Sequence, residues 1–209
     1  MENAQVQVNT THYNFLDYVG IMRWCSYYHQ IAETVKLNPK TVLVVGIGDN
    51  ITGKILSMQQ GIEVYTYDFD QALHPDFVGN VNDIDVVLQG KKFDVVLVCQ
   101  ILEHLPYSHF EEVLKKLRTA GAYIIMSLPH TRVNLTLSVK LHHCNTQSLN
   151  FGLHQFWKKV KFRGQHYWEI GKGKHTKRMI RKSIEKYFSI EKSFLAFGNH
   201  DHIFYVLSS

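Results

Sequence analysis

The segment VLVVGIGDN, residues 42–50, restricts the fold more than any other stretch of the chain. Four consecutive apolar residues lead directly into Gly46, Ile47 and Gly48, and two polar residues follow. A short apolar run that ends in a turn is typical of a strand buried on both faces, as in a parallel sheet covered by helices. Glycine in the turn lets the main chain approach a ligand closely. The segment therefore predicts an α/β fold with a ligand site beyond its first strand.

Other apolar runs alternate with helix-like segments, which is the pattern of an α/β sheet. The expected strands are residues 41–46, 62–67, 76–79, 93–99 and 122–128. The expected helices are an amino-terminal helix from about residue 13, segments at 52–61 and 106–121, and a helix at 175–187.

The carboxyl-terminal part of the chain predicts a hairpin. Two β-like runs, residues 188–197 and 202–207, are separated only by GNHD. A parallel crossover needs about a dozen residues or more, so these runs must pair in antiparallel fashion. The sequence thus predicts a Rossmann-like α/β fold: a seven-stranded mixed sheet, mostly parallel with an antiparallel last strand, and helices on both faces.

The composition predicts one domain that spans the whole chain. Of the 209 residues, 45% are apolar, so most of the unfolded surface can be buried in a single core. There is no run of about 18 apolar residues and no basic and apolar leader, so we expect neither a membrane partner nor a secretory signal. Cys25, Cys99 and Cys144 are odd in number and widely spaced, which predicts free thiols and a cytoplasmic protein.

The net charge of +5 is concentrated after residue 157, in WKKVKFRG and GKGKHTKRMIRK. This placement favours a solvated basic helix face with an adjoining loop. Neither an RNA-binding aromatic signature nor zinc-finger spacing accompanies the charge. A small molecule is therefore the favoured partner, and nucleic acid stays an alternative.

The glycine turn departs from two phosphate-binding motifs. A P-loop ends in Gly-Lys followed by Ser or Thr, whereas Ile55 follows Gly53 and Lys54. A dinucleotide fingerprint needs a third small residue where Ile51 stands. What remains is a turn without a dedicated phosphate cradle. Asp68 ends the second strand and can accept hydrogen bonds from two ribose hydroxyls, since a carboxylate offers several lone pairs.

Together these segments resemble the class I S-adenosylmethionine-dependent methyltransferases, in particular their small bacterial members. The resemblance covers about residues 40–209 and rests on the segments VLVVGIGDN, YTYDFD, VGNVNDID, FDVVLVCQILEHLP and AYIIMSLP, in this order. It implies a methyltransferase with S-adenosylmethionine as its cofactor, and a seventh strand that runs antiparallel beside the fifth.

The resemblance also implies which residues bind the cofactor. The glycine turn would let the main chain approach its methionine part, Asp68 would hold its ribose, and Phe69 would pack on its adenine. The predicted cofactor-binding residues are Gly46, Gly48, Asp49, Asn50, Asp68, Phe69, Asn80, Val81, Cys99 and Gln100.

Methyl transfer needs a general base only if the acceptor must lose a proton, and histidine suits this role near neutral pH. The predicted catalytic residues are Glu103, His104 and His130. They follow the fourth and fifth strands, and open α/β sheets place ligands at the carboxyl ends of their strands. Glu103 could equally cap the helix that comes next.

Residues 130–173 are too long for a simple connection, and we expect them to form an insertion that acts as a substrate lid. The predicted substrate residues in it are His166, Tyr167 and Glu169. The alternative is that the aromatic side chains of the insertion, such as Trp168, close the core.

Residues 1–40 are expected to form an amino-terminal helical cap. In this cap, Arg23, Trp24 and Tyr27 cover either the cofactor or the core. At the other end of the chain, His200 and His202 flank Asp201 in a hairpin loop that could reach the rim of the site.

No metal is expected from the local spacing of the candidate ligands. His142, His143, Cys144 and His154 lack the compact spacing of a structural zinc site, and no carboxylate accompanies them.

The sequence therefore predicts a methyltransferase that acts on a small-molecule or glycan-type acceptor. Methylation of RNA or protein is the alternative that the basic stretch favours. A non-catalytic nucleoside-binding module is a second alternative, since Val44, Asn50 and Asn80 depart from the motifs of the family. An NAD-linked oxidoreductase is disfavoured by Ile51 and by the terminal hairpin.

Overall fold

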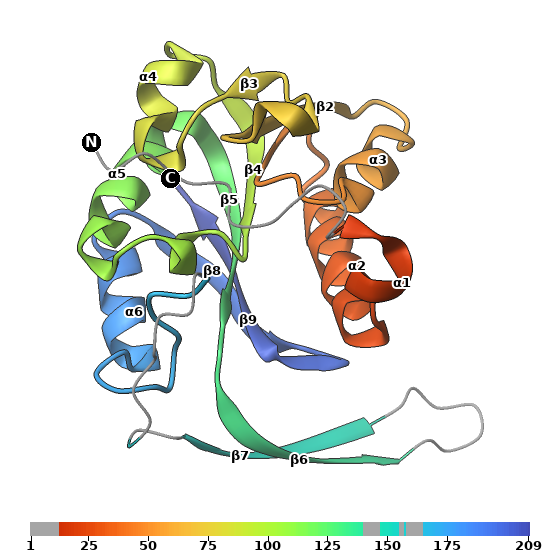
Figure 1. The fold of residues 1–209 in the computed structure, drawn as a ribbon, viewed down its shortest axis with the longest axis vertical. Helices are drawn as coiled ribbons and strands as arrows, with labels where there is room; N and C mark the ends of the chain where they lie inside the picture. The colour runs from red at the N-terminus through yellow and green to blue at the C-terminus, as the bar shows by residue number, and fades with distance from the viewer. Residues whose placement is uncertain (1–12, 140–146, 155–156, 158–164) are drawn as a thin grey trace.

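A seven-stranded sheet forms the centre of the computed structural model, which describes residues 13–139, 147–154, 157 and 165–209 (Figure 1). The strand order is β3-β2-β1-β4-β5-β9-β8. The strands are β1 Thr41–Val45, β2 Glu63–Asp68, β3 Phe77–Val78, β4 Phe93–Cys99, β5 Gly121–Pro129, β8 Ser189–Ala196 and β9 Asn199–Ser208. Only β9 runs antiparallel to its neighbours in this sheet, which confirms the predicted fold class.

The terminal hairpin inserts β9 between β5 and β8. The register of the antiparallel β5–β9 pair runs from Tyr123 opposite Ser208 to Pro129 opposite His202. The start of β9 therefore lies beside the end of β5. In this way the hairpin brings His202 to the edge of the sheet where the parallel strands end.

The strands β1, β4 and β5 are apolar along their length because both faces of the sheet are covered. In β1, Val42 and Val44 belong to one buried cluster, whereas Leu43 and Val45 belong to the other. Successive side chains of a strand point to opposite faces, so both sets are buried only if helices pack on each side.

The helices divide between the two faces of the sheet (Figure 1). One face carries α1 Phe15–Tyr18, α2 Ile21–Lys36 and α3 Ile51–Ser57, and the other carries α4 Ile84–Leu88, α5 Phe110–Ala120 and α6 Lys177–Glu185. The expected amino-terminal helix is divided in two at Val19 and Gly20. The sequence did not predict α4, because its five residues are too few for a helical pattern to be recognised.

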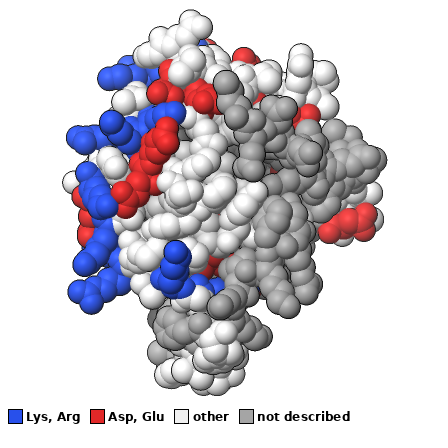
Figure 2. All heavy atoms as spheres, turned by 60° about the vertical axis from the view of Figure 1, so that its left-hand side comes forward, with Lys and Arg blue, Asp and Glu red and all other residues white. Residues whose placement is uncertain are grey.

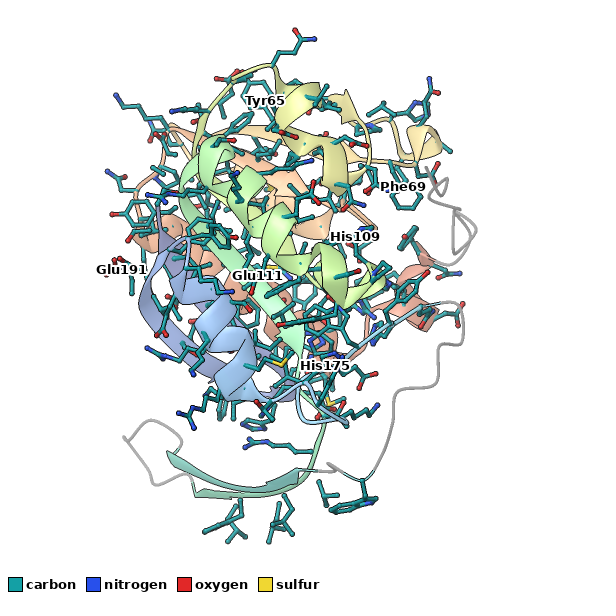
Figure 3. All side chains as sticks on the ribbon, turned by 90° about the vertical axis from the view of Figure 1, so that its left-hand side faces the viewer. Tyr65, Phe69, His109, Glu111, His175 and Glu191 are labelled. Atoms are coloured by element: carbon teal, nitrogen blue, oxygen red, sulfur yellow. The ribbon has the colours of Figure 1, made fainter. Side chains whose placement is uncertain are left out.

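The insertion contains a two-stranded ribbon that the sequence did not predict. Its strands are β6 Arg132–Val139 and β7 Gln147–His154, and Figures 1 and 3 show the ribbon apart from the main sheet. Val133 lies opposite Leu153 and Leu135 opposite Phe151. All four side chains are exposed, so they contribute little to the core of the isolated chain. Phe162, His142, His143 and Cys144 lie outside the described residues.

Among the described residues, Cys25 and Cys99 are free thiols, as expected. A search of the same part of the chain finds no helix with the length and apolar character that crossing a bilayer requires.

Core packing under α5 gives a first prediction. Leu114 of α5 is fully buried in the cluster that covers the α4–α6 face of the sheet. We expect Leu114→Ala to lower the free energy of unfolding by about 2–5 kcal/mol, because it removes buried apolar surface and leaves a cavity. Urea unfolding followed by circular dichroism measures the change.

The neighbouring exposed residue provides the control. Lys115→Ala should change the free energy of unfolding by no more than about 0.5 kcal/mol. Equal losses in the two variants would show that Leu114 is not part of the core.

Candidate functional site

The glycine turn after β1 adopts a conformation that needs glycine. Gly46 and Gly48 have φ angles of +75° and +50°, in the left-handed region that side chains disfavour. A Cβ atom on Gly46 would overlap the side chain of Ile101, which follows β4. The Gly46 amide donates to the carbonyl of Tyr67 at 2.8 Å, which fixes the turn against β2. The turn after β1 is therefore fixed in place, and its two glycines carry no side chain.

Asp68 connects this turn to the end of β2. Its carboxylate accepts a hydrogen bond from the Ile47 amide at 2.9 Å and another from the Asp70 amide at 2.9 Å. Burial raises the pKa of Asp68, and the two backbone hydrogen bonds act in the opposite direction. An ionised carboxylate has about four acceptor positions, so Asp68 keeps capacity for further donors.

Aromatic residues from the amino-terminal segment, residues 13–27, lie over the glycine turn. A Cβ atom on Gly48 would lie 3.4 Å from the ring of Tyr13 and 3.7 Å from the Tyr18 hydroxyl. The Tyr27 hydroxyl donates to the Asp49 carboxylate at 2.6 Å. Burial, followed by the negative charges around it, raises the pKa of Tyr13 to about 12. The sequence pointed to Tyr27 but missed Tyr13 and Tyr18, because short aromatic segments outside a long helix carry no periodic signal.

Two other members of the predicted cap lie close to these tyrosines. The Arg23 guanidinium carbon lies 3.8 Å from the centre of the Tyr18 ring. Trp24 stacks edge-on against Tyr27, and its own side chain is exposed. Arg23 and Trp24 therefore support the aromatic residues next to the glycine turn.

The residues that follow β2 and β3 combine an exposed ring with a capped turn. Phe69 is 41% exposed and lies near the edge of the domain (Figure 3). The Asn80 side chain accepts from the Asn82 amide at 2.9 Å, and the Asn80 carbonyl accepts from the Tyr67 hydroxyl at 2.7 Å. Val81 is buried. Phe69 is thus available to a ligand, whereas Val81 belongs to the buried core.

Glu103 and His104 lie in a short 3₁₀ turn, residues Leu102–His104, that follows β4. The Glu103 side chain is fully buried. One side-chain ligand atom from each of Glu103, His104 and His166 lies within 4.8 Å of the other two. The Tyr167 amide donates to the Glu103 carbonyl at 2.9 Å, which holds the two segments together. The structure therefore brings two predicted catalytic residues next to a predicted substrate residue.

Glu169 organises the far side of this group. Its carboxylate accepts from His166 Nδ1 at 3.2 Å, from the Thr131 hydroxyl and from Lys172 Nζ at 2.5 Å. His130 is buried at the end of β5, where its main chain bridges to Ile170, and it lies outside the Glu103, His104 and His166 group. Of the predicted catalytic residues, only His130 is separate.

Burial and hydrogen bonds determine the protonation of this group. Burial raises the pKa of Glu103 to about 8 and lowers the pKa of His104 to about 4. Burial acts to raise the pKa of Glu169, but hydrogen bonds from His166, Lys172 and Thr131 outweigh it and hold that pKa at about 2. At neutral pH, His104 is therefore a neutral imidazole and Glu169 is a carboxylate.

Gln100 links the group to the hairpin and to α2. Gln100 has a φ of +58°. In the amide orientation that gives both its oxygen and its nitrogen a hydrogen-bond partner, the nitrogen donates to Glu103 Oε1 at 3.2 Å and to His202 Nε2 at 3.3 Å. His202 Nδ1 lies 2.9 Å from the Ser26 hydroxyl. His202 therefore reaches the site from the hairpin. The neighbouring Cys99 has its pKa raised by burial to about 12, so it stays a neutral thiol.

Trp168 settles one alternative about the insertion. Its side chain is fully buried, and its indole nitrogen donates to the Leu105 carbonyl at 3.1 Å. Tyr167, by contrast, is 40% exposed, and Trp157 is also exposed. Trp168 thus closes the core, while Tyr167 and Trp157 stay accessible.

Comparison with known proteins shows the fold of this chain. No protein-family model matches the sequence, and no curated protein matches it. The methyltransferase domain of bacterial CtHen1 matches with a TM-score of 0.61 at 15% identity, over 90% of this chain and 100% of that one. A putative O-methyltransferase from Nostoc punctiforme matches with a TM-score of 0.62 at 12% identity, over 96% of this chain and 59% of that one.

A third solved structure was determined with ligands. The 1,6-didemethyltoxoflavin-N1-methyltransferase of Burkholderia thailandensis, with bound 1,6-didemethyltoxoflavin and S-adenosylhomocysteine, matches with a TM-score of 0.56 at 13% identity. The match covers 91% of this chain and 78% of that one. This chain therefore has the fold of class I methyltransferases.

The glycine turn gives a second prediction. Gly46→Ala should destabilise the protein more than Gly61→Ala, although both residues have positive φ angles, +75° and +83°. A Cβ on Gly61 would meet nothing within 4 Å, so Gly61→Ala measures the conformational cost alone, about 1–2 kcal/mol. Gly46→Ala adds the overlap with Ile101. Thermal and urea unfolding of both variants measure the difference, and equal effects would contradict the packed arrangement of the turn.

Proposed function

We propose that the chain is an S-adenosylmethionine-dependent methyltransferase that acts on a small-molecule or glycan-type acceptor. The observation that carries the proposal is the glycine turn of β1, which Asp68 of β2 holds by a hydrogen bond within a class I methyltransferase fold. Two solved structures of similar fold contain S-adenosylhomocysteine, the product that such a reaction leaves. A reducing cytoplasm stays the predicted location.

The described residues fit this cofactor. Gly46 and Gly48 have no side chain that would separate the main chain of the turn from a bound methionine group. The remaining acceptor positions of Asp68 suit two ribose hydroxyls, and the exposed ring of Phe69 suits adenine. Tyr13 and Tyr18 lie over the turn, where they would shield the bound group from water.

Bound S-adenosylmethionine would supply a methyl group that its sulfonium already activates. The chain must then hold the acceptor in line with that group, and positioning alone can contribute about 7–11 kcal/mol in favourable cases. With its pKa lowered to about 4, His104 is a weak base at neutral pH, so we assign it a part in positioning the acceptor rather than in removing a proton. The fixed carboxylate of Glu169 orients His166 opposite it.

The acceptor would enter from the side of the insertion. His166, the accessible ring of Tyr167, and Glu169 adjoin the Glu103 turn, which supports their proposed role in substrate binding. We infer that residues 130–173 act as the lid and residues 1–40 as the helical cap over the cofactor. The solved neighbours include enzymes for a glycopeptide, for 1,6-didemethyltoxoflavin and for small RNA, so a fold of this kind serves both classes of acceptor.

RNA or protein is the second candidate acceptor, and the basic face of α6 favours it. Figure 2 shows Lys and Arg side chains along one edge of the molecule with acidic side chains beside them. Arg181 pairs with Glu185 and Lys186 pairs with Glu111, which lowers the local positive charge. Binding of RNA would fall steeply with salt concentration. Acceptor binding that is insensitive to salt would therefore favour the small molecule.

Two acidic residues at opposite ends of the sheet give the third prediction. Asp68→Ala should weaken binding of S-adenosylhomocysteine by more than about tenfold, because charged hydrogen bonds contribute about 1.5–3 kcal/mol each. Asp94 accepts backbone hydrogen bonds from Lys40 and Thr41 at the other end of β1 and β4. Asp94→Ala should therefore lower stability and leave the affinity unchanged. Isothermal titration calorimetry measures both affinities.

The same titrations can reject the proposal. Unchanged affinity in Asp68→Ala would place the ribose elsewhere. A wild-type protein that binds neither S-adenosylmethionine nor S-adenosylhomocysteine at millimolar concentration would refute the proposed activity and leave the non-catalytic module. Preference for NADH over both would indicate an oxidoreductase.

A further inference from the structure

We propose that Glu103, His104 and His166 bind a divalent first-row transition-metal ion at the carboxyl edge of the sheet. The ion-binding site follows from the geometry of these residues. Its role in catalysis, orienting the acceptor, rests on the proposed function. The sequence predicted no metal because the ligands come from two segments that are far apart in the chain and meet only in the fold.

The ligand atoms lie close enough to share one ion. One atom from each of the three side chains lies within 4.8 Å of the other two. Imidazole nitrogens and carboxylate oxygens bind zinc at roughly 2.0–2.2 Å, so two ligands of one tetrahedral ion lie about 3.4 Å apart. A movement of each side chain by up to about 1 Å, which small side-chain rotations can supply, would bring all three into coordination.

Hydrogen bonds orient both imidazole rings for metal binding. His104 Nδ1 lies 3.0 Å from the Gln165 carbonyl, which can only accept, so this nitrogen carries the proton and Nε2 carries the lone pair. His166 Nδ1 lies 3.2 Å from Glu169 Oε1, which likewise directs the proton to Nδ1. Histidines that bind metals almost always donate their second N–H to a carbonyl or carboxylate. Each ring has one nitrogen held by such a partner.

The carboxyl group of Glu103 provides independent support. It is fully buried, and its Oε2 atom has no hydrogen-bond partner among the described residues. Gln100 can satisfy only the other oxygen, Oε1. A buried polar atom without a partner costs about 1–3 kcal/mol, more if the group is charged. A cation bound beside His104 and His166 would remove this cost.

The ligand set indicates which ions would bind. Two imidazoles with one carboxylate favour Mn²⁺, Fe²⁺, Co²⁺ or Zn²⁺, whereas Mg²⁺ and Ca²⁺ prefer oxygen ligands alone. Three protein ligands leave a coordination position open, which is typical of catalytic sites. An acceptor hydroxyl bound there would become more acidic and would be held in place for methyl transfer.

A cobalt titration tests the site directly and gives the fourth prediction. The whole chain is treated with a chelator, dialysed and titrated with Co²⁺, and the visible absorption of the bound ion is recorded. We expect one tight site per chain. His104→Ala and His166→Ala should each weaken it by at least tenfold. Glu169→Gln should weaken it by about 10–100-fold, since partners that orient ligands matter to that extent.

The control is a histidine outside the group. His74 is exposed and has a φ of +52°, which asparagine tolerates. His74→Asn should therefore leave Co²⁺ affinity unchanged. Circular dichroism spectra and melting temperatures establish that each variant is folded, and the His166→Ala variant, whose side chain is partly exposed, is the least disruptive.

Three outcomes would overturn the metal site. They are a wild-type protein that binds no Co²⁺, full binding in folded His104→Ala and His166→Ala, and equal affinity for Mg²⁺ and Co²⁺. Titration with S-adenosylhomocysteine is measured separately on the same samples. Loss of Co²⁺ binding with retained S-adenosylhomocysteine binding in His166→Ala would support both proposals. Co²⁺ binding without any affinity for S-adenosylhomocysteine would refute only the proposed methyl transfer.

Discussion

The hydrogen bond between the Ile47 amide and the Asp68 carboxylate is the constraint on which the candidate site depends. It joins the ends of two adjacent parallel strands, and it holds a turn whose glycines cannot be replaced without strain or overlap. Parallel strands end at a common edge, so this single bond places an acidic group and accessible main chain next to one another. The residues after β4 and β5 end at the same side of the sheet because β4 pairs in parallel with β1 and β5 pairs in parallel with β4.

The side of the sheet where the parallel strands begin and the side where they end differ in what their acidic residues do. Where the strands begin, Asp94 accepts hydrogen bonds from two backbone amides. These bonds lower its pKa and keep it in place as a structural carboxylate. Where the strands end, Glu103 is buried, and one of its carboxyl oxygens has no hydrogen-bond partner among the described residues. Burial raises the pKa of this carboxyl group. Buried polar groups are normally hydrogen-bonded. The oxygen without a partner therefore indicates that the side where the strands end is suited to ligand binding, whereas Asp94 stabilises the opposite side.

Sequence reasoning found the sheet because buried strands and a short hairpin connection leave direct local signals, although the connection is only Phe197 and Gly198, shorter than the predicted GNHD. The strand at residues 42–45 is recognised from four consecutive apolar residues, and the hairpin is recognised because GNHD is too short for a parallel crossover. The partnership of His104 with His166 could not be found in this way, because it depends on how the insertion returns to the sheet. Tyr13 and Tyr18 were missed because they precede the long helix α2 and carry no periodic signal. The exposed apolar side chains of the β6–β7 ribbon give no indication of register until the strands are paired.

The main-chain bridge between His130 and Ile170 has an evolutionary consequence. Thr131 donates to Ile170 at 2.8 Å and Ile170 donates to Pro129 at 3.0 Å, so the insertion leaves the sheet and returns to it at one point. The entropy of closing a loop grows only with the logarithm of its length. Related chains could therefore lengthen or shorten the part of this stretch that precedes His166 at small energetic cost, while His166 and Glu169 stay next to the point of return.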